Sequence, residues 1–369
     1  MEQLASLTEV EEQALSEITD SHLIKHLSAS IPSMVEMVAK VAQKQGAKGT
    51  ELYKVIIPKN ATLTKSKDMV GAVRGTYRNG SKIAGHANLV KVDPTKLNKA
   101  SQVSGGVTNV MNVASLVVGQ YYMAEVNAKL ETLNHGISKI GEFQEREFKS
   151  RIMSLLPRVA KITKFSSEIL ASEELRTRKL QQLDSLEGEA TQLLQQVNLA
   201  INELSRKNSE ISYQRYQELI REFQTLLKQQ QIIFATLEQI GQLMYLLNQG
   251  AVSATMCYSI YNVYLEESNE SRQALSEWHQ SQVERLKIKL EKNRIEKSGL
   301  IGAIAKLPGL VNNDLNYDQL APKLKKQITT QSKNKKFILT EPDSVFESDV
   351  QLVVKDGKYY YLPETKATQ

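Results

Sequence analysis

The chain contains a single cysteine, Cys257, among its 369 residues, so no disulfide can form within it. Disulfides are common in oxidising compartments and rare in the cytoplasm, so this composition favours a reducing environment. Proline and glycine are also scarce, with 8 and 18 residues. Because proline removes a backbone donor and glycine loses much conformational entropy in a helix, their scarcity favours long helices.

The first twenty residues lack lysine and arginine and contain six acidic residues. A secretory signal peptide begins with positive charge and continues into an apolar core, and this segment shows neither. We therefore expect a cytoplasmic protein, with peripheral association with a membrane as the alternative location.

Sequence motifs for catalysis, nucleotide binding and metal binding are missing. No glycine-rich loop ends in Gly-Lys-Ser/Thr, and no His-Glu-x-x-His occurs. His22 and His26 would share a helix face, but zinc takes three or four ligands and no Cys or His cluster completes the set. Cys257 has no His, Lys or Arg within one helical turn to stabilise a thiolate. We therefore expect no enzyme activity, no cofactor and no metal site.

Positive charge is concentrated in one segment. The formal net charge is +6, yet residues 40–99 carry 13 lysines and arginines against three acids. Glycines alternate there with valine and tyrosine, which indicates a small basic α+β module over residues 50–99. Its candidate patch for an anionic ligand consists of Lys54, Lys59, Lys65, Lys67, Arg74, Arg78 and Lys82.

Phosphates of anionic lipid or of nucleic acid would suit this basic patch electrostatically. The module has only Tyr53 and Tyr77 as aromatic residues, which is little for base stacking, so nucleic acid is the less favoured ligand. The alternative without a ligand is that the patch docks against the acidic N-terminal helix or is simply solvated.

Two long stretches, residues 100–124 and 239–265, contain no Asp, Glu, Lys or Arg. Each exceeds the roughly 20 residues needed to cross a bilayer. Several Asn and Gln residues in both stretches make a permanent membrane span costly. Two interpretations stay open: a buried core of a soluble bundle, or helices that enter a membrane. Small residues, which let helices pack closely, mark both stretches at Ala114, Ser115, Gly119, Gly250, Ala251 and Ala254.

The apolar pattern is helical from Val107 onward for about two hundred residues. Pro157 interrupts it and predicts a kink or break. A turn is expected over residues 206–212, RKNSEIS. The clearest feature is an alternation of three and four, typical of a coiled-coil seam, in Leu183, Leu186, Ala190, Leu193, Val197, Ala200 and Leu204.

These patterns predict a mainly α fold: an elongated helical bundle or coiled coil, a small basic α+β N-terminal module and a C-terminal β-hairpin. The hairpin rests on Asp356-Gly357 between two apolar runs, a signal for a type I′ turn. The expected segments are N-terminal helices over 1–49, the basic α+β module over 50–99, a long-helix bundle over 100–300, an irregular basic linker over 301–335 and a β-hairpin tail over 336–369.

Three strings, SLVVGQYYMAEVN, DSLEGEATQLL and PGLVNNDLNY, resemble an uncharacterised bacterial family of long-helix proteins. The likeness covers about residues 50–320 and implies no particular activity. Long helices with shielded apolar segments are also similar in plan to the α-helical pore-forming toxins.

The sequence therefore favours a non-enzymatic bacterial scaffold or interaction protein that acts through its long helices. Its partner would be another protein or a second copy of the chain. The alternatives are a membrane-active protein with an architecture like that of α-helical pore-forming toxins, acting on an anionic membrane, and nucleic-acid binding through the basic module.

Overall fold

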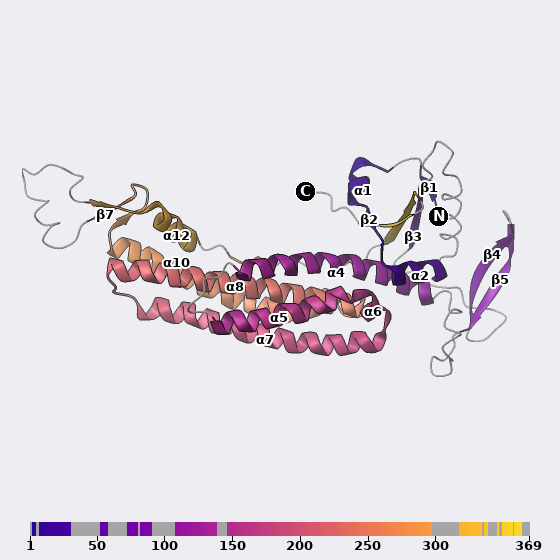
Figure 1. Cartoon of the computed structure of the whole chain (residues 1–369), viewed down its shortest axis with the longest axis horizontal. Helices are drawn as coiled ribbons and strands as arrows, with labels where there is room; N and C mark the ends of the chain where they lie inside the picture. Colours follow the sequence, from indigo (N-terminus) through magenta and orange to yellow (C-terminus); the bar gives the residue numbers. More distant parts are fainter. Residues whose placement is uncertain are drawn as a thin grey trace, which may run out of the picture.

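The structure is a computed structural model and is mainly α, with small antiparallel sheets, as predicted (Figure 1). The residues that it describes are 2–4, 7–30, 52–57, 72–79, 82–90, 108–138, 146–296, 317–333, 336–338, 345–346, 349–356 and 358–363. Residues 31–49 of the expected N-terminal helical segment lie outside these ranges.

Five long helices form the bundle and lie side by side along the long axis of the molecule (Figure 1). Their bounds are Thr108–Ser138 for α4, Arg146–Lys164 for α5, Glu173–Lys207 for α7, Tyr213–Asn248 for α8 and Ser259–Arg285 for α10. With 35 and 36 residues, α7 and α8 are each about 50–55 Å long at about 1.5 Å per residue. Elongation of the whole molecule in solution stays a prediction.

Serine caps start the two longest helices. The Ser172 side chain accepts from the Leu175 N–H at the start of α7, and Ser212 accepts from the Arg215 N–H at the start of α8. Such caps satisfy backbone donors that the first turn of a helix leaves without a partner. The connection between the two helices falls within the predicted turn over residues 206–212.

Short helices link or flank the long ones. They are α1 (Glu9–Ala14), α2 (Ser21–Ser30), α6 (Ser166–Ala171), α9 (Ala254–Cys257) and α12 (Pro322–Ser332). Helix α12 lies inside the segment that we expected to be an irregular linker, and Pro322 at its first turn and the buried Leu324 and Ile328 account for it. Helix α5 continues through Pro157 without a break.

A five-stranded antiparallel sheet joins the two ends of the chain, in the order β1-β3-β9-β10-β2. The predicted hairpin forms from β9 and β10 around Asp356, whose φ of 52° suits the turn. Instead of standing alone, β9 pairs with β3 and β10 pairs with β2. The strand bounds are Glu2–Leu4, Leu52–Ile57, Val350–Lys355, Lys358–Leu362 and Ser16–Glu17 in that order.

Two smaller antiparallel sheets complete the described strands. One is the hairpin of β4 (Ala72–Asn79) and β5 (Lys82–Val90). The other has the order β6-β7-β8, with bounds Ile288–Lys289, Arg294–Glu296 and Tyr317–Gln319.

A buried polar cluster ties α7, α8 and α10 together. The Gln230 amide of α8 donates to Asn198 Oδ1 of α7 at 2.7 Å and to Ser271 Oγ of α10 at 2.9 Å. Arg272 Nε donates to Gln230 Oε1 at 2.6 Å, and burial lowers the pKa of Arg272 to about 10. Because unpaired polar groups are costly in a core, this cluster fixes how the three helices align.

Helix α12 is fastened to the bundle through His279 of α10. Its Nδ1 lies 3.0 Å from the Tyr216 hydroxyl, and its Nε2 lies 2.9 Å from Gln331 Oε1 on α12. The Gln331 amide also donates to the Ile220 carbonyl of α8. Burial lowers the pKa of His279 to about 4, so the imidazole is neutral at pH 7.

The chain that follows α12 lies against the bundle at Phe337. Its ring stacks on Phe234 of α8 at 4.2 Å, and the Arg272 guanidinium lies 4.0 Å from the ring centroid. The Asn269 side chain accepts from the Phe337 N–H and donates to its carbonyl. This contact holds Phe337 against α8 and α10.

Two glycines of α4 test the close packing of that helix. A Cβ at Gly119 would lie 3.0 Å from Leu170 Cδ1 of α6, whereas a Cβ at Gly136 would meet nothing within 4 Å. We expect Gly119→Val to lower the free energy of unfolding by about 1–3 kcal/mol, because it overpacks a buried contact. Gly136→Val should change it by less than about 1 kcal/mol. Equal effects in urea unfolding would contradict the packing described here.

The His279 contacts predict a pH dependence of stability. An unfolded imidazole takes up its proton near pH 6.5, but the folded one takes it up only near pH 4, so protons favour the unfolded state between these values. Relative to His279→Gln, which does not titrate there, wild type should lose roughly 3 kcal/mol of stability as the pH falls from 6.5 to 4. A difference between the two proteins that stays constant with pH would refute this assignment.

Candidate interaction groove between α7 and α8

Helix α5 covers the α7–α8 pair over only part of its length. The Arg158 guanidinium of α5 binds both carboxylate oxygens of Glu189 of α7 at 2.8 Å, well inside the covered part. Near the first turn of α5 the cover ends, at Phe148 and Arg151. The burial of the seam residues on α7 changes at the same place. The seam residues from Leu183 to Val197 are buried, whereas Ala200 and Leu204 are only half-buried.

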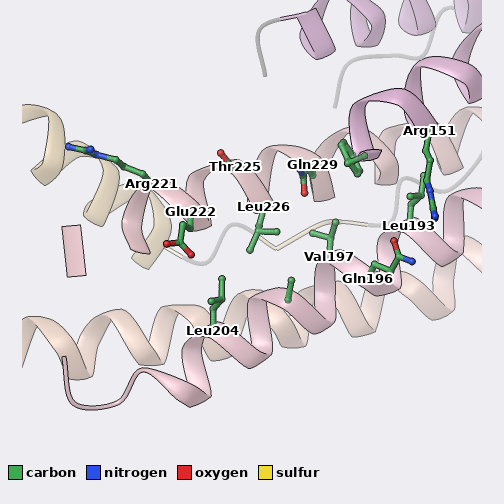
Figure 2. A pocket seen from close by; sticks show the side chains of 12 residues that line it. Arg151, Leu193, Gln196, Val197, Leu204, Arg221, Glu222, Thr225, Leu226 and Gln229 are labelled. Carbon is green, nitrogen blue, oxygen red and sulfur yellow. The ribbon is translucent and has the colours of Figure 1, made fainter. Parts of the chain in front are cut away.

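The uncovered part of the pair forms a groove of about 540 Å³, here called the α7–α8 groove. Figure 2 shows that Val197 and Leu204 from α7 and Leu226 from α8 project into the space between the two helices. The groove is lined by Phe148, Arg151, Leu193, Gln196, Val197, Ala200, Leu204, Arg221, Glu222, Thr225, Leu226 and Gln229.

One amide in the α7–α8 groove has no partner. Gln229 is 5% exposed and points into the groove (Figure 2), and within the described part of the chain its side chain makes no hydrogen bond. The neighbouring Gln230 is fully bonded in the polar cluster. The Gln229 amide atoms are not among the buried polar atoms that lack a partner, so they reach the solvent in the groove, where an occupant that covered them would have to supply a polar contact.

The charges around the groove are mainly positive. Arg151 and Arg221 line it from opposite ends (Figure 2). Its acidic residue, Glu222, is already bridged by Arg215 at 3.1 Å. Arg221 forms no ion pair with the residues that the structure describes. An occupant of the groove would therefore meet, at Arg221, a positive charge that no described residue neutralises.

The lining of the groove offers binding groups and no catalytic set. It contains neither His nor Cys, and its carboxylate is held by an arginine. Cys257 lies elsewhere and is buried, and burial raises the pKa of its thiol, which opposes a reactive thiolate. In the described part of the chain, no group of three or more His, Cys, Asp and Glu side chains could hold a metal ion.

The predicted basic patch is distributed over three strands. Lys54 lies on β3, Arg74 and Arg78 on β4, and Lys82 on β5. In the β4–β5 ladder Arg74 is opposite Asn88 and Arg78 is opposite Ile83. Lys59, Lys65 and Lys67 lie outside the described residues. An anionic ligand for this patch stays a prediction.

The small residues of the first uncharged stretch lie on α4. Ala114 and Gly119 are buried and Ser115 is half-buried, and Gly119 lies against Leu170. The second stretch is divided among three helices, the end of α8, α9 and the start of α10. α8 ends at Asn248, and Gln249 and Gly250 have positive φ, which reverses the chain.

Gly250 and Ala251 are therefore exposed in a turn, and half-buried Ala254 starts α9. Close approach occurs instead at Gly241, where a Cβ would lie 3.1 Å from the Cys257 carbonyl oxygen. Among the described helices, none combines the length and the apolar composition that a membrane crossing requires.

Comparisons of this chain with protein-family models, with curated proteins and with solved structures found no match. Any assignment of function therefore rests on the groove and the bundle themselves.

Two adjacent glutamines of α8 allow a matched test of the groove. Gln230→Leu should lower the free energy of unfolding by about 2–4 kcal/mol, because it leaves Asn198 and Arg272 without their amide partner. Gln229→Leu should change it by less than about 1 kcal/mol, since no bond within the fold is lost. Chemical unfolding measures the free energy of unfolding of both variants. A loss for Gln229→Leu as large as that for Gln230→Leu would show that Gln229 stabilises the fold and is not reserved for a ligand.

Proposed function

We propose that this chain is a non-enzymatic interaction protein that binds an amphipathic helix of a partner protein in the α7–α8 groove. The observation that carries the proposal is the length of the apolar seam, which continues past the start of α5 into the uncovered residues Ala200 and Leu204. Apolar side chains at helical spacing favour a second helix as the occupant.

The packing of α5 supports this choice of occupant. α5 packs on α7 and α8 directly beside the groove, and its residues Ile152, Leu155 and Val159 are buried there. Among the described residues, the groove begins at the first turn of α5, and the same two helices that bind α5 line it. The groove follows residues 193–204 of α7 and 221–229 of α8, so it offers a helix several turns of contact, whereas a small-molecule ligand is normally enclosed on most of its surface.

A groove-filling substitution tests the proposal. A library of 20-residue helical peptides, displayed on phage, is selected on immobilised full-length protein. Peptides with apolar residues at positions i, i+3 and i+4 should be enriched and should lose at least tenfold in affinity for Ala200→Trp, whose indole occupies the groove. Leu199→Trp is the matched control. Leu199 directly precedes Ala200 in the same turn of α7, but its side chain is 52% exposed and does not line the groove.

Thermal unfolding of each variant shows whether it is folded, and Leu226→Lys provides a second block from the α8 wall. If no helical peptide is enriched, or if the enriched peptides bind both blocked variants as well as wild type, the α7–α8 groove is not the binding site. A wild-type dimer in sedimentation that Ala200→Trp dissociates would show that the occupant is a second copy.

A further inference from the structure

Building on the proposed helix-binding function, we infer that the partner helix is acidic and carries one amide or hydroxyl side chain, set about two helical turns from an acidic residue on an otherwise apolar face. Two features of the α7–α8 groove lead to this description. They are the free amide of Gln229 on its floor and the free guanidinium of Arg221 at one end.

The amide of Gln229 selects the polar residue. Helix-forming peptides with a fully apolar face would cover this amide and leave its donors and acceptor without water or a partner. A Gln, Asn, Ser or Thr on the partner helix would restore those bonds. A single polar pair in an apolar seam also fixes the register of two helices, because every other alignment buries it unpaired.

Arg221 selects the charge. It stands at one end of the groove with no ion pair among the described residues (Figure 2). Glu222 is held by Arg215 and so does not neutralise Arg221. A carboxylate at the edge of the docked helix would pair with Arg221, whereas a lysine there would be repelled.

The spacing of the two features follows from α8 itself. Arg221 and Gln229 are eight residues apart on one helix, which is about 12 Å at about 1.5 Å per residue. A helix lying along α8 covers the same distance in eight residues. Its acidic residue and its amide or hydroxyl residue should therefore be seven or eight positions apart.

Three synthetic peptides of 21 residues test this description. All have leucine at the spacing of the groove-facing stripe and alanine or serine elsewhere. The first has Glu and Gln eight positions apart, the second replaces Gln by Leu, and the third replaces Glu by Lys. Each carries fluorescein, and its anisotropy is followed during titration with full-length protein.

The first peptide should bind wild type about tenfold more tightly than either of the others, which corresponds to about one hydrogen bond or ion pair. Gln229→Leu should remove or reverse the preference for the Gln peptide over the Leu peptide. Arg221→Glu should reverse the preference for the Glu peptide over the Lys peptide. Ala200→Trp should weaken all three, and Leu199→Trp should weaken none.

The outcomes separate this inference from the function on which it rests. If all three peptides bind equally and remain sensitive to Ala200→Trp, the groove binds helices but the acidic and amide description is overturned. A preference for the Lys peptide overturns the charge assignment. If no peptide binds at low salt and the Ala200→Trp protein is unchanged in every assay, both the inference and the proposed function fail.

Discussion

A mismatch in helix length governs this molecule. α7 and α8 pack antiparallel and have 35 and 36 residues, but α5, which packs on both, has 19. An apolar stripe stabilises a bundle only where another element removes it from water. Since the stripe on α7 continues past the first turn of α5, its last residues gain only part of that stabilisation. The α7–α8 groove is the direct result, and a partner helix would complete the burial.

The opposite face of the same pair is held in a different way. Where α10 packs, the contact includes the amide of Asn198, the amide of Gln230 and two serines in addition to apolar side chains. Hydrophobic packing alone tolerates sliding of one helix along another, but a bonded cluster allows one alignment. The α7–α8 pair is thus fixed in register by α10 on one side, which keeps the groove on the other side in a defined shape.

Much of the fold could be predicted from residue patterns, because helices and turns depend on local signals. The seam from Leu183 to Leu204, the turn at 206–212 and the hairpin at Asp356 are of this kind. The sheet partners β2 and β3 could not be predicted, since pairing between distant strands leaves no local pattern. The groove could not be predicted either. Ala200 and Leu204 continue the same apolar spacing as the buried seam residues, and they are only half-buried because α5 does not extend over them. Gln229 and Gln230 are likewise the same residue type. Only the directions in which they leave α8 distinguish the amide without a hydrogen bond from the bonded one.

The five-stranded sheet has a consequence for biosynthesis. Its ladder joins β2, at residues 16–17, to β10, at residues 358–362, so contacts such as that between Lys358 and Glu17 span 341 positions. During translation the helical hairpins can form as soon as they leave the ribosome, because their partners are near in sequence. β2, near the start of the sequence, can pair only after β10 has been synthesised. Until then β2 and the edge of β3 that pairs with β9 carry unpaired backbone groups, which favour aggregation.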